Sequence, residues 1–172
     1  MKHTKNILKS LLIMIVAISL FTVSCSKDEG GSKPTNPTSI TINAATINSV
    51  LSAKAAQSTF SGVELDFNNF TPNSGEVTVN ATINAEVNID TLKTELTSAF
   101  TFNYNGASIK AEADTSFPTA NTGNDNAIVN ISINAGNNTF AKDVETAYKV
   151  SDKTATLKLT ITPNKKWNNT SK

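Results

Sequence analysis

The 172-residue chain has no arginine, one histidine and one cysteine, and these shortages exclude whole classes of chemistry. Without a guanidinium group it lacks the bidentate clamp that commonly binds phosphates and carboxylates. The only histidine, His3, lies near the N-terminus, so the rest of the chain has no imidazole for a general base or a zinc ligand. A single cysteine forms neither an intramolecular disulfide nor a cysteine-based metal site. We therefore expect no cofactor and no bound metal.

A strong net charge is also missing. Three of the fifteen lysines lie before residue 25, so the remainder of the chain carries twelve lysines against fourteen acidic residues, a net charge of −2. Nucleic-acid-binding proteins need a basic surface to neutralise phosphates. The composition therefore predicts no nucleic-acid partner.

The first 24 residues have the pattern of a signal peptide. Lys2, Lys5 and Lys9 precede an apolar stretch over residues 11–23, and small residues then lead to Cys25. The thirteen-residue stretch is shorter than the roughly 20 residues that a helix needs to cross a bilayer. The pattern predicts that residues 1–24 direct export and are removed, in preference to an uncleaved membrane anchor.

The segment Thr22-Val23-Ser24-Cys25 resembles the lipobox of bacterial lipoproteins. Thr22 departs from the leucine that is usual three residues before the cysteine. The resemblance implies cleavage between Ser24 and Cys25 and acylation of the Cys25 sulfur with diacylglycerol, whose chains are fatty acids such as palmitate. It therefore implies that the protein is attached to a membrane through a lipid anchor.

Lys27, Asp28 and Glu29 follow directly and look like the export signal of surface lipoproteins in the Bacteroidota. This resemblance implies an outer-membrane lipoprotein that faces outside the cell, with the periplasmic face as the alternative. Residues 25–38 as a whole are rich in Gly, Ser and Pro, which is typical of a linker that is partly flexible and partly extended.

Period-two alternation is the clearest pattern beyond the linker. From residue 77 to residue 89 the odd positions are apolar and the even positions are Thr, Asn or Glu. Asn105-Gly106 is a strong signal for a two-residue hairpin, because a type I′ turn needs positive φ at both positions. We predict an all-β domain over residues 39–163, an antiparallel meander of seven or eight strands forming a sandwich or an up-and-down barrel or half-barrel, and a polar tail over residues 164–172.

The individual elements are expected as follows. A short helix over residues 48–57 has Ser49 as its N-cap. Residues 91–99 fit a strand, but they also fit a helix, because Leu92, Leu96 and Ala99 recur at helical spacing. The expected strands cover residues 39–47, 59–70, 77–89, 92–104, 109–113, 127–133, 140–150 and 157–161.

Three pairs of acidic residues are candidates for acid–base chemistry. They are Glu64 with Asp66, Glu112 with Asp114, and Asp143 with Glu145. On a strand, residues two apart lie on one face about 6–7 Å from each other, a separation that suits a glycosidase pair. Because all three pairs fall on predicted solvent-facing sides of strands, we expect them to keep the surface soluble and not to catalyse.

Four further features have a functional and a structural interpretation. Asp90-Thr91-Leu92 resembles the O-glycosylation motif of Bacteroidota, which makes Thr91 a candidate site; the competing interpretation is an ordinary hairpin connection. The oxygen-rich loop 121–126 is expected to be a turn and not a Ca²⁺ site. Trp167 is expected to be a stray apolar residue of the tail, although an exposed ring would stack on a sugar. Phe100, Phe102 and Tyr104 share a face and are expected in the core.

Asn and Thr dominate the predicted solvent-facing sides, where they offer hydrogen bonds without charge. We therefore predict a non-enzymatic binding or interaction domain, with a glycan or a protein at the cell surface as its partner. One alternative is a carrier of an apolar ligand, since Ala81, Ala85, Ala111 and Ala113 leave room inside a barrel. The other alternative is a carboxylate-dependent glycan hydrolase, which would use the acidic pairs.

Overall fold

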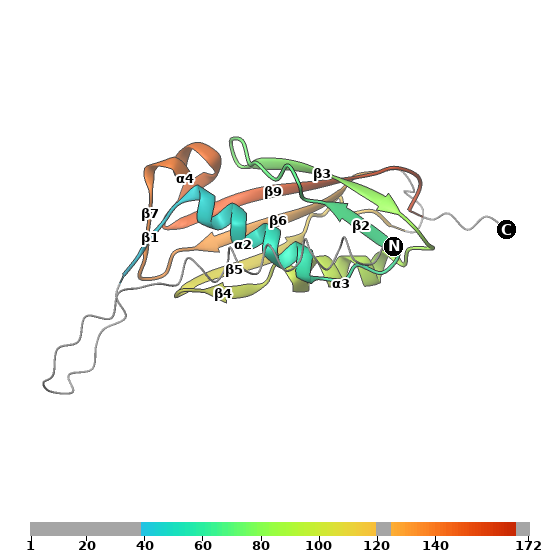
Figure 1. Ribbon diagram of the computed structural model, residues 1–172, viewed down its shortest axis with the longest axis horizontal. Coiled ribbons are helices and arrows are strands. Elements are labelled where there is room, and N and C mark those ends of the chain that lie inside the picture. The colour runs from blue at the N-terminus through green and yellow to red at the C-terminus, as the bar shows by residue number, and fades with distance from the viewer. Residues whose placement is uncertain (1–38, 120–124, 168–172) are drawn as a thin grey trace, which may run out of the picture. The chain divides into compact units, whose positions relative to one another are not determined.

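The computed structural model describes residues 39–119 and 125–167. Strands hold 40% of these residues and helices hold 25%, which confirms the predicted β-rich class. The main sheet is a curled half-barrel with the strand order β2-β3-β9-β6-β5-β4 (Figure 1). Its strands are β2 (Val63–Asp66), β3 (Glu76–Ile83), β9 (Thr154–Pro163), β6 (Ala127–Asn134), β5 (Ala107–Ala113) and β4 (Phe102–Tyr104).

Three short strands complete the β structure. β8 (Lys149–Ser151) pairs with the first residues of β9, ahead of the stretch of β9 that pairs with β3. β1 (Thr41–Ile42) and β7 (Thr139–Phe140) form a separate two-stranded sheet. Residues 39–47 and 140–150 were each predicted as one strand, and both predictions are wrong, because each segment contains a short strand followed by helix.

The sheet is not the fully antiparallel meander that the alternation predicts. β3 and β9 run parallel, with Val77 opposite Leu159 and Thr78 opposite Thr160, and β1 and β7 are also parallel. Parallel neighbours need a long crossover connection instead of a tight turn. Here the chain leaves β3 through a helix, builds β4, β5 and β6, and returns as β9 on the far side of β6.

The helix predicted over residues 48–57 is confirmed and begins earlier. α2 spans Ala44–Gln57, and its N-cap is Asn43 instead of Ser49. The Asn43 side-chain oxygen accepts a hydrogen bond of 2.8 Å from the backbone N–H of Thr46, which satisfies one of the free donors of the first turn.

Two other helices replace predicted strands. α3 spans Ile89–Ala99, so the helical spacing of Leu92 and Leu96 was the correct interpretation and the strand was wrong. The preceding strand ends at Ile83 and not at residue 89. α4 spans Lys142–Ala147, inside the segment predicted as the strand 140–150. None of the helices that the structure describes has the length and apolar character of a membrane span.

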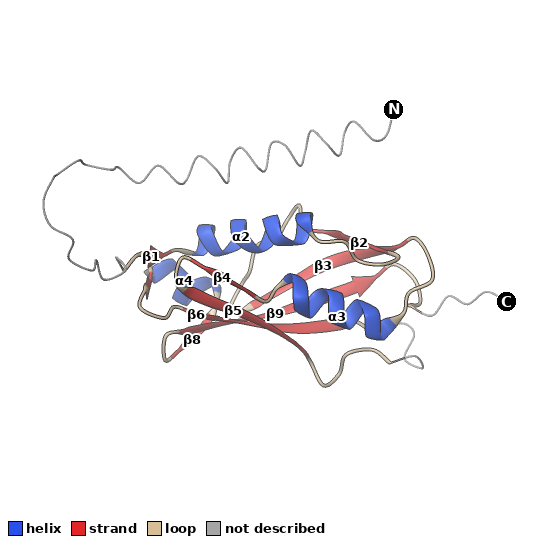
Figure 2. Ribbon diagram, turned by 90° about the horizontal axis from the view of Figure 1, so that it is seen from below, coloured by secondary structure: helices blue, strands red, loops and turns tan. Residues whose placement is uncertain are grey.

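One face of the sheet is buried and the other is open. Figure 2 shows α2 and α3 on the same side of the sheet. Alternate residues of the central strands point to that side and are nearly inaccessible, and they pack with Leu51 of α2 and with Leu92 and Leu96 of α3. Burying such aliphatic side chains contributes about 1.5–3 kcal/mol each. The buried residues of the central strands are Val77, Val79, Ala81 and Ile83 of β3, Ala155, Leu157, Leu159 and Ile161 of β9, and Ala127, Val129, Ile131 and Ile133 of β6.

The predicted hairpin at Asn105-Gly106 is confirmed. The two residues have φ values of 45° and 80°, and Tyr104 pairs with Ala107 across the turn. Gly136, in the predicted turn after β6, also has positive φ, at 62°. The two turns touch, because a Cβ atom built on Gly136 would lie 2.5 Å from the carbonyl oxygen of Gly106.

Candidate functional site

The sheet face that the helices leave uncovered carries polar side chains in rows. We call it the open face. It consists of Glu64 and Asp66 of β2, Glu76, Thr78, Asn80 and Thr82 of β3, Thr154, Thr156, Lys158, Thr160 and Thr162 of β9, Ile128, Asn130, Ser132 and Asn134 of β6, and Ser108, Lys110 and Glu112 of β5. These residues alternate with the buried ones along each strand.

The pairing register aligns these side chains across the strands. Thr160 of β9 lies between Thr78 of β3 and Ile128 of β6. Directly opposite residues in neighbouring strands have Cβ atoms about 4.5–5.5 Å apart. The hydroxyl and amide groups of the open face therefore form a two-dimensional array, interrupted at Ile128, which no single strand provides.

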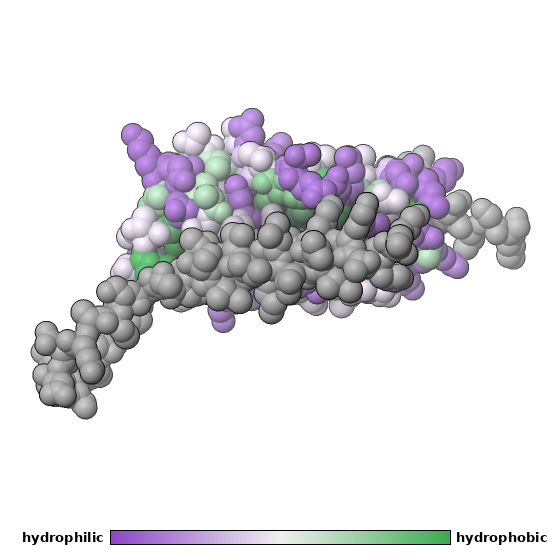
Figure 3. Space-filling view, viewed as in Figure 1, coloured by the Kyte–Doolittle hydropathy of each residue, from purple (hydrophilic) through white to green (hydrophobic). Residues whose placement is uncertain are grey.

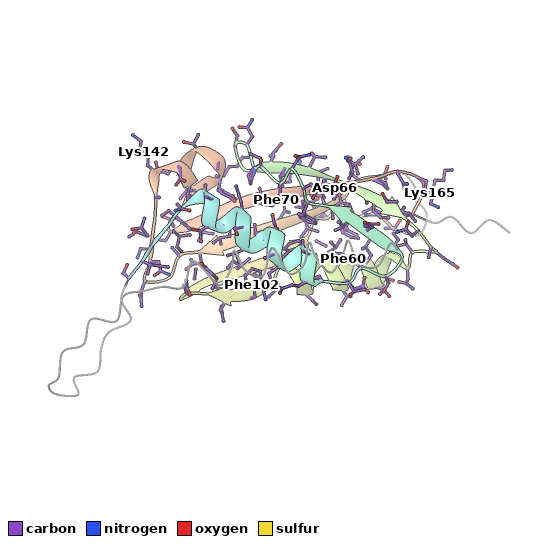
Figure 4. All side chains as sticks on the ribbon, in the orientation of Figure 1. Phe60, Asp66, Phe70, Phe102, Lys142 and Lys165 are labelled. Atoms are coloured by element: carbon purple, nitrogen blue, oxygen red, sulfur yellow. The ribbon has the colours of Figure 1, made fainter. Side chains whose placement is uncertain are left out.

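Lys158 and Lys110, the lysines of the open face, each have a glutamate beside them. Lys158 lies opposite Glu76 of β3, and Lys110 Nζ lies 2.5 Å from Glu112 Oε1. The hydrogen bond from Lys110 and its positive charge lower the pKa of Glu112. The positive charge at the centre of the face is therefore offset by neighbouring carboxylates. Glu64 and Asp66 of the edge strand β2 lie opposite Thr82 and Asn80, so this edge of the face is negatively charged; Figure 4 labels Asp66.

Most of the uncharged polar groups of the open face have no partner in the protein. Asn134 Nδ2 donates to Thr154 Oγ1, and Thr156 Oγ1 donates to the Lys149 carbonyl. Seven other polar side chains of the face make no hydrogen bond within the part of the chain that the structure describes. They are Thr78, Asn80, Thr82, Thr160, Thr162, Ser132 and Ser108. Their donors and acceptors are therefore free to bind a ligand or water.

The first acidic pair, Glu64 and Asp66, lies on β2 with both side chains exposed, as predicted. In the second pair, Glu112 is in β5 and Asp114 follows its last residue. Asp114 accepts hydrogen bonds from the Ser116 backbone, the Asn130 amide and the Ser116 hydroxyl, which lower its pKa to about 2. A general acid needs a raised pKa, so the surroundings of Asp114 favour a structural role.

The third acidic pair does not share a face. Asp143 and Glu145 lie in α4, and residues two apart on a helix point in different directions. The predicted strand geometry of this pair is therefore wrong. Asp143 Oδ2 instead accepts a hydrogen bond of 3.1 Å from the backbone N–H of Ala44, at the start of α2.

Two hollows in the described part of the domain bear on ligand binding. An open cleft of about 960 Å³ lies beside the start of α3, with Glu86, Asp90, Lys93 and Asp114 among its lining residues. An apolar cavity of about 10 Å³ lies between α2 and the sheet, lined by residues such as Leu51. Ligand pockets typically measure about 300–1,000 Å³, so the apolar cavity offers little room for the apolar ligand of the carrier alternative.

No metal-binding cluster occurs in residues 39–119 or 125–167, where no group of three or more His, Cys, Asp or Glu side chains is suitably placed. The predicted loop 121–126 lies mostly outside the described residues. The same holds for the signal peptide, for Ser24 and Cys25, for Lys27, Asp28 and Glu29, and for the linker. These predictions are not tested by the structure.

Thr91 is exposed, but it lies in the first turn of α3 instead of a hairpin turn. Its backbone N–H donates a hydrogen bond of 3.0 Å to Asn88 Oδ1, the N-cap of the helix. Its glycosylation stays a prediction. Phe100 is completely buried, and Phe102 and Tyr104 pack against the core, as expected.

Trp167 is a core residue that the sequence interpretation missed. Its side chain is 0% exposed, and Nε1 donates a hydrogen bond of 2.7 Å to the Asp125 carbonyl. The interpretation of Trp167 as part of a polar tail is therefore wrong, and stacking of its ring on a sugar is excluded in this structure. Asn164 also joins the sheet, since its Oδ1 accepts the N–H of Ile83 at 3.0 Å.

Comparison with known proteins gave no relative. No protein-family model matches the chain, and the searches of curated proteins and of solved structures also found no match. A functional assignment therefore depends on the residues of this chain alone.

Proposed function

We propose that this protein is a lipoprotein, anchored through Cys25 in the outer membrane and facing outward, and that its open face binds neutral, hydroxyl-rich glycans without catalysis. The anchor is supported by the signal-peptide pattern, the lipobox-like Thr22-Val23-Ser24-Cys25 and the export-like Lys27, Asp28 and Glu29. The linker over residues 25–38 joins the anchor to the domain.

The observation that carries the binding proposal is the array of free, uncharged hydrogen-bonding groups on the open face. Thr and Ser hydroxyls and the Asn amide each donate and accept, as sugar hydroxyls do. Because Lys158 and Lys110 each lie beside a glutamate, the centre of this face presents no excess of positive charge, and its free groups are neutral hydroxyls and amides. A neutral polyhydroxylated surface is therefore its best chemical complement.

Other partner classes fit this face less well. Nucleic acids require a surplus of positive charge, which the open face lacks. Tight protein interfaces use buried aromatic or arginine anchors, and none of the open-face residues is of either type. Ile40 and Val150 are the large hydrophobic side chains most exposed among the described residues, at 36% and 38%; Figure 3 gives the hydropathy of the residues on one face.

The hydrogen-bonding array predicts weak binding by each copy. A hydrogen bond exchanged with water contributes only about 0.5–1.5 kcal/mol. Many copies anchored in one membrane would bind a polymeric ligand together, because the second contact forms at high effective concentration. Useful retention of a glycan thus needs display on a membrane as well as the open face.

A direct test is gel electrophoresis of the full chain, in detergent, through gels containing dextran, starch or mannan. We expect retardation by at least one of these neutral polymers, and a double variant Thr78→Val/Thr160→Val should weaken binding by about tenfold, because two hydroxyls at the centre of the face are lost. The matched control is Thr94→Val/Thr97→Val on α3, which should bind as the unchanged protein does. Retardation by none of the polymers, or equal weakening by both double variants, would falsify the proposal.

Salt dependence separates this mechanism from charge attraction. Binding through neutral hydrogen bonds should change less than about twofold between 50 and 500 mM salt, because screening acts on charges. A steep loss of binding with salt would point to an ionic ligand and would contradict the role given to the open face.

A further inference from the structure

The first strand of the domain is bonded to a segment about one hundred residues later. The Ile40 N–H donates to Asn138 Oδ1 at 3.1 Å, and the Ile40 carbonyl accepts from the Thr139 N–H at 3.1 Å. The Ile42 carbonyl accepts from the Ala141 N–H at 2.8 Å. These bonds build the parallel pair of β1 and β7, and they fix the point where the linker meets the domain.

The same distant segment also holds α2. Asp143 places a carboxylate at the N-terminus of α2, where the helix dipole favours negative charge, and bonds to the Ala44 N–H. Further along the helix, the Tyr148 hydroxyl hydrogen-bonds to the Asn48 side-chain oxygen. Tyr148 is only 2% exposed, and burial together with the nearby Asp143 charge raises its pKa, so its hydroxyl keeps the proton that it donates.

Asn138 connects this contact to the main sheet. Asn138 is 4% exposed, and among the described residues no other polar or charged residue is as deeply buried. Its Oδ1 accepts from Ile40, while its Nδ2 donates at 2.8 Å to the carbonyl of Asn105 in the β4–β5 hairpin. One amide group thus ties the start of the domain to a turn of the sheet.

The contact lies at one end of the sheet. The Ala135 N–H bonds to the Lys153 carbonyl there, so β6 ends and β9 begins beside the contact. β9 then runs the length of the sheet to Pro163. In Figure 4, Lys142 near this contact and Lys165 beyond β9 lie toward opposite ends of the domain. Tension between the N-terminal linker and the far part of the sheet therefore reaches residues 40–48 first.

We propose that the bonds between residues 40–48 and residues 138–148 form a latch that resists force, which keeps the domain folded when it is pulled through its N-terminal linker. The inference rests on the anchor at Cys25 and goes beyond glycan binding. A displayed domain that holds a glycan is pulled between its ligand and its membrane. β1 has only two residues, so its own strand pairing is short, and the side chains of Asn138, Asp143 and Tyr148 add the bonds that spread the load.

The test is single-molecule pulling of the full 172-residue chain, made without lipid. The chain is attached through Cys25, its only thiol, and pulled from a C-terminal handle. Asn138→Ala and Asp143→Ala should each shorten the folded lifetime at constant load by roughly tenfold, because they remove hydrogen bonds that bear the load. Asp143→Ala is the safer variant for folding, since it removes one exposed contact, and Asp143→Asn should restore the lifetime because the amide oxygen still accepts from Ala44.

A second attachment point gives the control. In a Cys25→Ser/Lys93→Cys chain the load enters through α3 and bypasses the latch, so Asp143→Ala should change the lifetime by less than about twofold, as a surface substitution normally does. Equal shortening in both geometries, or no shortening in the Cys25 geometry, would overturn the latch. Lipid analysis of Cys25 tests the anchor separately. A result against the anchor can therefore be distinguished from a result against the latch.

Discussion

Replacing Gly136 with alanine should lower the free energy of unfolding by about 3 kcal/mol, whereas the same change at Gly106 should lower it by only about 1 kcal/mol. Both glycines have positive φ, at 62° and 80°, so both substitutions strain the backbone. At Gly136 the new Cβ atom would also lie 2.5 Å from the Gly106 carbonyl oxygen. At Gly106 the nearest atom, Asn138 Nδ2, is 3.6 Å away, which is ordinary contact.

The two variants form a matched pair, and urea unfolding of each measures the difference. The larger loss at Gly136 arises because two backbone turns must move apart, and that movement also disturbs the Asn138 amide between them. Equal losses for the two variants would show that the turns are not in contact, and the described packing at this end of the sheet would then be wrong.

Replacing Trp167 with alanine should lower the free energy of unfolding by about 3–5 kcal/mol, although the residue lies five positions from the C-terminus. Its ring is fully buried, and its indole N–H satisfies the Asp125 carbonyl. Alanine would leave a cavity and an unpaired carbonyl.

Far-UV circular dichroism during urea unfolding measures this effect, because the variant loses its only tryptophan and with it the fluorescence probe. Lys166→Ala is the control, since Lys166 is exposed, and it should change stability by less than about 0.5 kcal/mol. If Trp167→Ala were as stable as Lys166→Ala, residues 164–167 would be a tail after all and the core would end with β9.

The strands of the sheet centre were predictable because their pattern is local. β3 shows strict alternation and β6 shows it from Val129 onward, and the open-face Thr and Asn residues of these strands follow from it directly. The hairpin at Asn105-Gly106 was predictable for the same reason, since a two-residue turn with positive φ needs these residue types. Local stereochemistry determines such features, so one sequence suffices to identify them.

The ends of the helices and strands and the order of the strands in the sheet were harder to predict from the sequence. The alternation continues past Ile83 because Val87 and Ile89 are also buried, although the N–H groups of Asn84 and Ala85 already turn to the Gly62 carbonyl. Asn88 followed by Asp90 was an available N-cap signal for α3. The parallel pairing of β3 with β9 joins strands about eighty residues apart and depends on the path of the whole chain, which no local pattern records.

The candidate site likewise combines features that local sequence predicts with features that only the whole fold determines. The sequence identified the polar side chains of the open face as solvent-facing, but only the strand register shows that Thr78 lies beside Thr160 and that Lys158 lies opposite Glu76. The sequence also suggested acidic pairs, of which Asp143 proves to cap α2. The latch of Asn138 was invisible in the sequence, because its partners Ile40 and Asn105 are 98 and 33 residues away.

The lipid anchor at Cys25 is tested most directly by the mass of the N-terminal peptide of the protein purified from membranes. We expect a peptide that begins at Cys25 and carries a diacylglycerol group on its sulfur, and we expect a Cys25→Ser chain to gain no lipid and to leave the membrane fraction. A peptide that begins at Met1, or an unmodified Cys25 in membrane-bound protein, would contradict the anchor.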